Sequence, residues 1–180
     1  ATQNPPHINI CTANINFIKH KMHIVKNLIE TDNIQILGLT ETKTKRNIKI
    51  PHFITYHEPS VMDNARGTAL AICDKFPSTE QDLSQNLAHL EVIAANVLIA
   101  KTSFTVICYY NPPTEKISSR LLQYVSQFPN AILIGDLNCR HTDFGDKFTN
   151  PNGRKLVNHL ISHPIIRLEN RQPTLINHHG

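Results

Sequence analysis

The sequence predicts a single α+β domain, and three observations lead to this prediction. Apolar runs with the length of strands outnumber stretches with helical spacing. Two of these runs, 90–99 and 104–110, are separated only by Lys101-Thr-Ser, which is typical of a hairpin and makes part of the sheet antiparallel. The length of 180 residues suits one domain with a substantial core and is short for two. Short helices should therefore cover a sheet or a pair of sheets.

Strands are expected wherever β-branched and other apolar residues form short runs bounded by polar or turn residues. In chain order these runs are 8–12, 34–39, 53–57, 68–73, 90–100, 104–110, 131–137 and 165–168. Three helices are expected at 21–30, 115–128 and 151–163, because apolar side chains fall on one face of each. Asn150 is a candidate cap for the third helix, and Pro151 suits its first turn.

Composition narrows the class of protein without identifying it. The 40% hydrophobic content argues against disorder, and no apolar run approaches the length of a membrane span. The first residues show no basic segment followed by an apolar one, so an unsecreted, soluble protein is expected. The net charge of +4 is compatible with a polyanionic partner. The four cysteines show no zinc-ligand spacing, which favours reduced thiols in an intracellular protein.

The most informative segment is Ala131-Ile-Leu-Ile-Gly-Asp-Leu-Asn138. An apolar strand runs into Gly135, which permits close backbone approach, and Asp136 and Asn138 then leave the sheet on the same side. A second apolar run, beginning at Ile34, ends at Glu41. Two carboxylates at the ends of two buried strands predict a site for a hard cation.

Other polar residues at strand ends are ambiguous when each is taken alone. Asn14 follows the first strand, where an asparagine is most often a cap or turn residue. Arg66 precedes a glycine and is equally consistent with a surface turn. Tyr109 and Tyr110 end an apolar strand before Asn111-Pro-Pro, and either phenol could simply pack in the core.

The order of these motifs is far more specific than any one of them. In chain order the motifs are Asn14, Glu41, Arg66-Gly, Tyr110-Asn-Pro-Pro, Gly135-Asp-Leu-Asn and His141-Thr-Asp-Phe-Gly. Together they resemble the endonuclease domain of non-LTR retrotransposons, with the Jockey-like group most similar. That domain is a branch of the endonuclease/exonuclease/phosphatase superfamily, which also includes the AP endonucleases. The resemblance extends from Ile8 to about Ile176. It implies a two-sheet β-sandwich flanked by helices, a four-layer α/β/β/α arrangement.

The resemblance also implies a phosphodiesterase site. Glu41 and Asn14 would hold Mg²⁺, with Mn²⁺ as an alternative, and Asp136 would deprotonate the attacking water. Asn138 and Tyr110 would contact the phosphate. The resemblance further implies contacts with DNA from Arg66, Arg140 and His141. The reaction would nick one strand of double-stranded target DNA and leave a 3′-OH that primes a reverse transcriptase of the parent polyprotein, which places the protein in the nucleus.

Two departures from the family pattern are visible. Ala13 and Phe17 replace an aromatic and a glycine that relatives often carry, so the first loop is expected to be reshaped. The sequence printed here contains neither the later aspartate-bearing strand nor the Ser-Asp-His motif of relatives, and His178 and His179 precede the place where those strands would start. Residues 1–180 are therefore expected to be one endonuclease-type domain, incomplete at its C-terminus and lacking the last strands. By itself this chain is expected to nick DNA weakly or not at all, although its full-length parent would be a nuclease.

Rival functions are less well supported. His159 and His163 lie four residues apart, but no acid stands between them as in a metalloprotease, and a solvated helix face is favoured over a metal site. No Gly-x-Ser-x-Gly elbow or glycine-rich phosphate loop occurs. Two alternatives stay open beside the retrotransposon nuclease. One is another phosphodiesterase of the superfamily acting on repair DNA, lipids or inositol phosphates, and the other is a non-catalytic remnant that folds or binds DNA.

Overall fold

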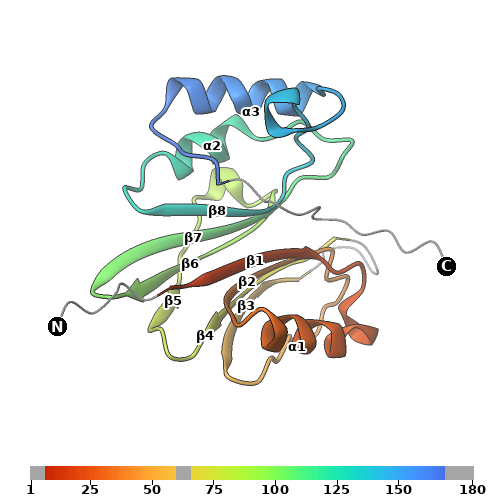
Figure 1. Ribbon diagram of the computed structural model, residues 1–180, viewed down its shortest axis with the longest axis vertical. Helices are drawn as coiled ribbons and strands as arrows, with labels where there is room; N and C mark the ends of the chain where they lie inside the picture. Colours follow the sequence, from red (N-terminus) through yellow and green to blue (C-terminus); the bar gives the residue numbers. More distant parts are fainter. Residues whose placement is uncertain (1–6, 60–65, 169–180) are drawn as a thin grey trace.

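Two four-stranded sheets lie face to face and carry α-helices on their outer sides (Figure 1). The computed structural model describes residues 7–59 and 66–168. The first sheet has the order β1 (Asn9–Asn14), β2 (Ile34–Thr40), β4 (Thr68–Cys73), β3 (Phe53–Glu58). The second has the order β5 (Ser78–Glu80), β6 (Glu91–Ile99), β7 (Thr102–Tyr110), β8 (Ala131–Asp136). The α+β, two-sheet class predicted from the sequence is confirmed.

Each sheet mixes parallel and antiparallel pairs, and the parallel pairs bring strand ends together. β1 runs parallel to β2, with Asn14 opposite Thr40, and β7 runs parallel to β8, with Tyr110 opposite Asp136. The predicted hairpin of β6 and β7 is confirmed. Its two-residue turn has positive φ at both Ala100 and Lys101, the backbone of a type I′ turn, which matches the twist of the flanking strands.

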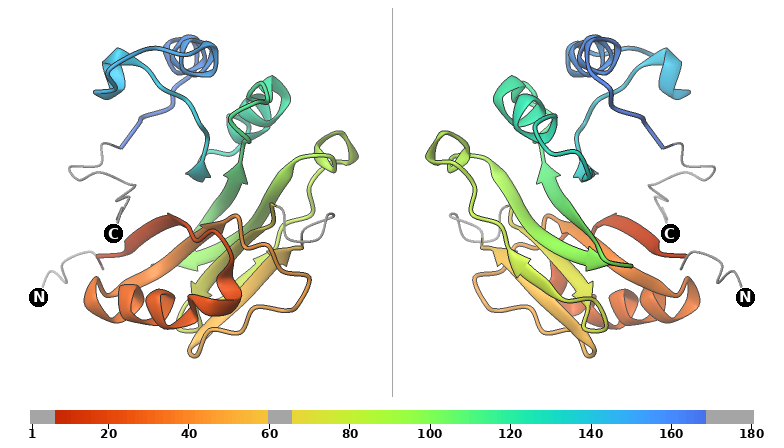
Figure 2. Two further views of the ribbon diagram at one scale, coloured as in Figure 1. Left: turned by 90° about the vertical axis from the view of Figure 1, so that its right-hand side faces the viewer. Right: turned by 90° about the vertical axis from the view of Figure 1, so that its left-hand side faces the viewer.

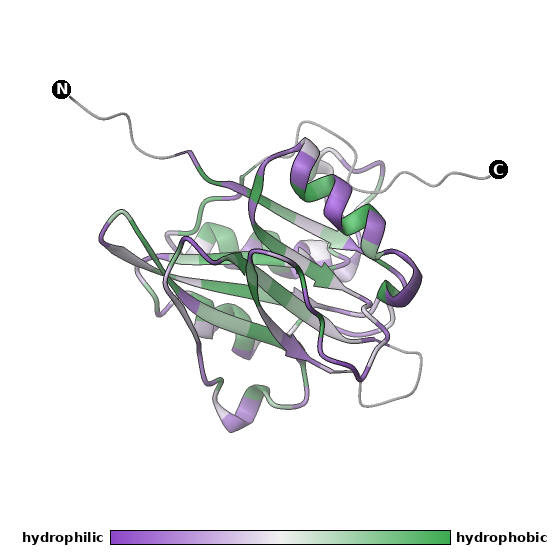
Figure 3. Cartoon of the chain, turned by 90° about the horizontal axis from the view of Figure 1, so that it is seen from below, coloured by the Kyte–Doolittle hydropathy of each residue, from purple (hydrophilic) through white to green (hydrophobic). Residues whose placement is uncertain are grey.

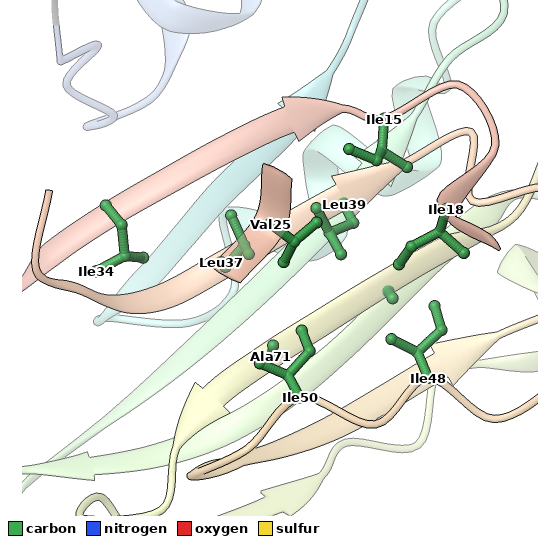
Figure 4. Close-up of a cluster of buried hydrophobic side chains, with 10 residues drawn as sticks. Ile15, Ile18, Val25, Ile34, Leu37, Leu39, Ile48, Ile50 and Ala71 are labelled. Carbon is green, nitrogen blue, oxygen red and sulfur yellow. The ribbon is translucent and has the colours of Figure 1, made fainter. Parts of the chain in front are cut away.

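Three apolar layers hold the sandwich together. Between the sheets, residues such as Ile36, Leu70 and Val106 pack with almost no exposure to solvent. On the outer face of the first sheet, helix α1 (Met22–Thr31) places Val25 over strand residues including Leu37, as Figure 4 shows. On the outer face of the second sheet, the helices α2 (Ser119–Val125) and α3 (Pro151–Ser162) cover a third cluster. The result is the four-layer α/β/β/α arrangement (Figure 2).

The helices follow from their sequences. α1 shows bands of hydrophilic and hydrophobic residues along its length in Figure 3, as an amphipathic helix on a sheet requires. The Asn150 side chain accepts a hydrogen bond from the Gly153 N–H, which confirms it as the N-cap of α3. Short 3₁₀ segments η1 (Ile18–His20), η2 (Gln85–Leu87) and η3 (Thr142–Phe144) complete the elements of the described residues.

The second helix is shorter than the predicted 115–128. The segment before it is not helical, because asparagine side chains take over hydrogen bonds that a helix would make. Asn111 and Asn152 both donate to the Glu115 carbonyl, and the Ile117 N–H donates to Asn152 Oδ1. Ser118 then caps the helix by accepting from the Leu121 N–H.

The predicted strand at 165–168 is wrong. These residues form no strand, and the side chains of Ile166 and Leu168 are 84% and 82% exposed. An apolar run alone does not make a strand where no neighbouring strand pairs with it.

β5 was not predicted, because its three residues are polar. Ile176, His178 and His179, named above from the sequence, lie outside the described residues. No helix in the described part of the chain is long and apolar enough to span a membrane.

Candidate active site at the strand ends

Four polar side chains from four strands meet at one edge of the sandwich. The Asn14 amide (β1) donates from Nδ2 to Glu41 Oε1 at 2.7 Å and to Asp136 Oδ2 at 3.2 Å. The Tyr110 hydroxyl (β7) donates to the same Glu41 Oε1 at 3.1 Å. Glu41 directly follows β2, and Asp136 ends β8. Residues as far apart as 14 and 136 in the sequence thus form one hydrogen-bonded group, which we call the carboxylate cluster (Asn14, Glu41, Tyr110 and Asp136).

The strand register explains why these side chains meet. The carboxyl ends of parallel strands lie at the same edge of a sheet, and β1 and β8 of the two sheets lie beside each other there (Figure 1). Gly135 makes the close approach of β8 to β7 feasible. A Cβ on Gly135 would lie 2.0 Å from the Tyr109 carbonyl oxygen, and its φ of +129° is a conformation that other residues rarely adopt.

Strand alternation separates the two tyrosines that the sequence left ambiguous. Tyr110 faces the carboxylate cluster, whereas the Tyr109 hydroxyl points into the second sheet's outer core and donates to Asn111 Oδ1 at 2.9 Å. Burial and the charge of Glu41 raise the pKa of Tyr110 to about 12. Its hydroxyl is therefore protonated at neutral pH and serves as a donor to Glu41.

Glu41 is the centre of the local electrostatics. Burial raises the pKa of its carboxyl, but hydrogen bonds from Asn14, Lys43 and Tyr110 outweigh burial and leave the pKa below its usual value. The Lys43 ammonium lies 3.1 Å from Glu41 Oε2. Glu41 is thus ionised at neutral pH, and its two oxygens face different partners: amide and phenol donors on Oε1, and a cation on Oε2.

Several residues around the cluster have left-handed backbone conformations that are unusual for side chains of their type. Glu41, Lys43, Arg66 and Asn138 have φ values of 52°, 49°, 62° and 48°. Such residues cost on the order of 1–3 kcal/mol each and concentrate at functional sites, where the surrounding structure holds them in place. Here the Lys43 N–H donates to the Arg66 carbonyl at 2.8 Å, which ties two of the strained turns together.

Asn111 is a hub that the sequence reasoning did not single out. It is 1% exposed, and its Nδ2 donates to the carbonyls of Glu115 and Leu137. Its backbone N–H donates to the Asp136 carbonyl, and its own carbonyl accepts from Asn138 Nδ2 at 2.9 Å. Asn138, expected to reach a phosphate, therefore also braces the turn that follows β8. No residue-type signal reveals this hub, because asparagine before two prolines is an ordinary turn sequence.

The three residues predicted to contact DNA occupy two loops beside the cluster. Arg66 pairs with Glu115, with 2.6 Å between its NH2 nitrogen and Oε1, and remains 39% exposed. Arg140 is exposed, and its guanidinium lies 5.1 Å from the centre of the Phe148 ring. His141 caps η3, because its Nδ1 accepts from the Asp143 N–H. Arg140 and His141 therefore belong to the loop that follows Asn138, and Arg66 stands on the other loop.

The donor set of the carboxylate cluster fits a hard cation. Glu41 and Asp136 supply carboxylate oxygens on either side of the Asn14 amide, the ligand type that Mg²⁺ and Mn²⁺ prefer, and water can complete the shell. In the described residues, no group of three or more histidine, cysteine, aspartate or glutamate side chains is placed to hold a metal. The cluster is thus suited to a metal held by few protein ligands and several waters, rather than to a closed cage.

The predicted solvated face at His159 and His163 is wrong in one respect. The His159 ring is partly buried, lies 2.9 Å from Ser126 Oγ through Nε2, and stacks on the His163 ring with centroids 3.9 Å apart. Burial and the neighbouring His163 lower the pKa of His159. The pair joins α3 to α2, and parallel stacking does not aim both rings at one metal ion.

The four cysteines are free thiols, and their positions show a packing role. Cys108 is fully buried between the sheets, and burial raises its pKa to about 12. Cys11 and Cys73 lie in β1 and β4, as their apolar surroundings in the sequence predicted. Cys139 follows the turn after β8, and burial and Asp136 raise its pKa to about 12. Thiols this weakly acidic are poor nucleophiles at neutral pH.

The fold and the carboxylate cluster define the class: this is the endonuclease/exonuclease/phosphatase fold. Solved structures confirm it. The endonuclease domain of TRAS1, a telomere-specific non-LTR retrotransposon, is similar with a TM-score of 0.70 and 18% identity, over 87% of this chain and 72% of that one. An AP endonuclease from Archaeoglobus fulgidus is similar with a TM-score of 0.56 and 20% identity, over 87% and 70% of the two chains. These identities are evidence for the fold alone.

The sequence comparison points to the retroelement branch. The family model described as "Endonuclease-reverse transcriptase" matches residues 104–180, which include most of β7, all of β8 and the loop after Asn138. The predicted resemblance to a retroelement endonuclease is therefore confirmed for this part of the chain. A third solved structure, the 3′ phosphatase NExo from Neisseria bound to a product DNA hairpin, is similar with a TM-score of 0.56 and 18% identity, over 87% and 71% of the two chains. No curated protein sequence matches this chain.

Proposed function

We propose that this chain is a metal-dependent DNA endonuclease domain of a non-LTR retrotransposon. It hydrolyses one strand of double-stranded target DNA and leaves a 3′-OH that primes reverse transcription. One observation carries the proposal: Asn14, Glu41, Tyr110 and Asp136 converge from both sheets into a single hydrogen-bonded cluster. The match of residues 104–180 to the "Endonuclease-reverse transcriptase" model supports the retroelement context and a reverse transcriptase in the parent polyprotein.

Each residue of the cluster has a chemical role in this proposal. Glu41 and the Asn14 amide oxygen would hold Mg²⁺ or Mn²⁺, which would neutralise charge on the phosphate when bound. Asp136 orients and deprotonates the attacking water, and the Asn14 amide fixes the direction of its carboxylate. Tyr110, protonated because its pKa is raised to about 12, donates a hydrogen bond toward Glu41 or a phosphate oxygen. Asn138 stands next to the same phosphate position.

The loops around the cluster supply the DNA surface in this proposal. Arg66 and Arg140 neutralise phosphates on two sides of the scissile bond, and His141 lies in the same loop as Arg140. Contacts of this kind position a duplex without reading its sequence. Since the substrate is chromosomal DNA, the proposal places the protein in the nucleus.

A plasmid-nicking assay tests the proposal. With Mg²⁺ or Mn²⁺ present, the chain should convert supercoiled plasmid slowly to nicked circles, and a DNA polymerase should extend the nick without prior end repair. Asp136→Ala should lower the nicking rate by about 100-fold or more. Glu30→Gln on α1 is the matched control, because this exposed acid lies near the opposite end of β2 from Glu41 and should leave the rate unchanged.

The assay also separates the alternatives. DNA binding without metal-dependent nicking would identify a non-catalytic binder. Cleavage restricted to abasic DNA, or hydrolysis of inositol phosphates in its place, would identify another phosphodiesterase of the superfamily. Nicking that persists at the full rate in Asp136→Ala would remove the carboxylate cluster from the chemistry.

A further inference from the structure

One aromatic side chain near the cluster has no structural role in the core. Phe148 is 54% exposed and lies in the loop 140–150, which begins two residues after Asn138. The Arg140 guanidinium lies 5.1 Å from its ring centre. Phe144, in the same loop, is different: it is partly buried against the core under α2 and α3, with Arg167 4.4 Å from its ring centre. Phe144 anchors the loop, and Phe148 presents its ring to solvent.

The loop is built so that Phe148 has a defined position relative to Asp136. Its two ends are joined, because the Asn150 N–H donates to the Arg140 carbonyl at 2.9 Å and the Arg140 N–H donates to Asn150 Oδ1 at 3.1 Å. Asn150 Nδ2 also donates to the Asn138 carbonyl at 2.9 Å. Gly153 permits this packing, since a Cβ there would lie 1.9 Å from the Arg140 carbonyl oxygen. Figure 2 shows the turn of η3 standing out beside α3.

The charges around Phe148 suit a polyanion. Arg140, whose guanidinium lies over the ring, and Lys147, which precedes Phe148 in the chain, are both exposed. Of the two acids of the loop, Asp146 is engaged within it, because its Oδ2 accepts from the His141 N–H at 2.9 Å, whereas the Asp143 side chain is 70% exposed. An exposed aromatic ring flanked by cations is the combination with which proteins bind unstacked bases, because the ring stacks on the base while the cations contact the phosphates.

We infer that Phe148 stacks on a base of the target DNA that is opened from its neighbour beside the scissile phosphate, with Arg140 on the adjacent phosphate. The inference rests on the proposed function and adds a structural preference to it. An apolar side chain that enters a base step must unstack it, so DNA whose step is already open binds with a smaller penalty. The chain should therefore favour duplexes with an unpaired base over fully paired ones, whatever their sequence.

The sequence itself offers a clean probe, because it contains no tryptophan. Phe148→Trp creates a single fluorophore at the proposed contact, and Leu98→Trp is the matched control. Leu98 is 45% exposed and pairs with Ser103 near the β6–β7 turn, at the opposite end of β6 from Glu91, which pairs with Tyr110. Both variants are titrated, without divalent metal, with two short duplexes identical except for one unpaired adenine. Stacking should quench Phe148→Trp saturably, and more fully with the unpaired base, while Leu98→Trp stays unchanged.

Affinity gives the second measurement. Anisotropy of fluorescein-labelled duplexes should show that Phe148→Ala weakens binding to the unpaired-base duplex by about 5- to 150-fold. Phe148→Tyr should retain the wild-type affinity, because its ring also stacks. Binding to the paired duplex should change less, so Phe148→Ala should lose the preference that the wild-type protein shows.

The outcomes distinguish this inference from the proposed function. If the wild-type protein binds both duplexes, but Phe148→Trp is not quenched and Phe148→Ala binds like the wild-type protein, the stacking contact is wrong and the endonuclease proposal stands. If the wild-type protein binds neither duplex, both proposals fail. Equal quenching at Phe148→Trp and Leu98→Trp would indicate nonspecific adsorption and would also overturn the stacking contact.

Discussion

Replacing Asn111 by alanine tests whether the hub beneath the cluster contributes to stability as its contacts indicate. The side chain is 1% exposed and forms three hydrogen bonds, one from the Tyr109 hydroxyl and two to backbone carbonyls. After the change, the Glu115 carbonyl keeps Asn152 as a donor, and the Leu137 carbonyl keeps the weaker Cys139 thiol at 3.4 Å. The group that loses its acceptor is the Tyr109 hydroxyl, which is 1% exposed with the rest of that residue.

These contacts set the expected magnitude. A buried donor left without an acceptor costs about 1–3 kcal/mol, and the small cavity adds about 1 kcal/mol. Asn111→Ala should therefore lower the free energy of unfolding by about 2–4 kcal/mol. Tyr109→Phe in the same background should recover part of the loss, because it removes the stranded hydroxyl. Burial raises the pKa of Tyr109 to about 12, so this hydroxyl is neutral and the effect should not depend on pH near neutrality.

Urea unfolding followed by far-UV circular dichroism measures these differences. Asn158→Ala on the exposed side of α3 is the matched control and should change stability by less than about 0.5 kcal/mol. A loss below about 1 kcal/mol in Asn111→Ala would refute the assignment of Asn111 as a hub. So would an equal loss in Asn111→Ala and in the double variant with Tyr109→Phe, because the two side chains would then not be coupled.

Three further predictions concern the carboxylate cluster, the two loops proposed to contact DNA, and Gly135. Glu41→Gln should abolish Mg²⁺ binding measured by calorimetry. The pKa of Glu41 in the folded state is lowered from 4.5, so the contacts of its ionised form stabilise the fold above that pH. This contribution is lost as the pH falls through the folded-state pKa. The wild-type protein should therefore lose its stability advantage over Glu41→Gln on acidification. Arg66→Glu and Arg140→Glu should each weaken binding to duplex DNA, measured by anisotropy, and should make its decline with salt less steep. Unchanged affinity and slope in either variant would exclude the loop that carries that arginine from the DNA surface. Gly135→Ala should lower the free energy of unfolding by about 3 kcal/mol or more, because its Cβ meets the Tyr109 backbone at a φ of +129°. A urea midpoint equal to that of the wild-type protein would contradict the close approach of the two strands.

Much of the fold could be predicted because its strands are buried. β2 and β4 have almost no exposed residue, so their apolar runs mark them clearly. β5 escaped prediction because it is a three-residue polar strand at the sheet edge, held by pairing with β6 rather than by its own apolar residues. The segment 165–168 failed for the converse reason, since three of its four residues are apolar but it pairs with no strand among those described.

The candidate site could be predicted only in part. The acids at the ends of two strands were visible, because each follows an apolar run, but nothing local says that Glu41 and Asp136 approach the same amide. That contact crosses between the two sheets and depends on their packing. The strand-end pattern predicted a shared cation site for the two acids, but the resemblance to known nucleases was needed to add Asn14 and Tyr110. The Asn111 hub and the pairing of Lys43 with Glu41 were missed for a related reason. A lysine near a strand end and an asparagine before prolines are ordinary surface and turn residues until their partners are known.

The cluster also connects function with the stability of the sandwich. Asn14 and Glu41 belong to the first sheet, whereas Tyr110 and Asp136 belong to the second, so both hydrogen bonds, from Asn14 to Asp136 and from Tyr110 to Glu41, cross between the sheets. Two carboxylates that share one amide donor repel each other, and Lys43 offsets this charge on one side only. A cation bound between the carboxylates would remove the remaining repulsion and join the sheets more strongly. Metal binding at this edge should therefore stabilise the fold, and the gain should rise with the logarithm of the metal affinity.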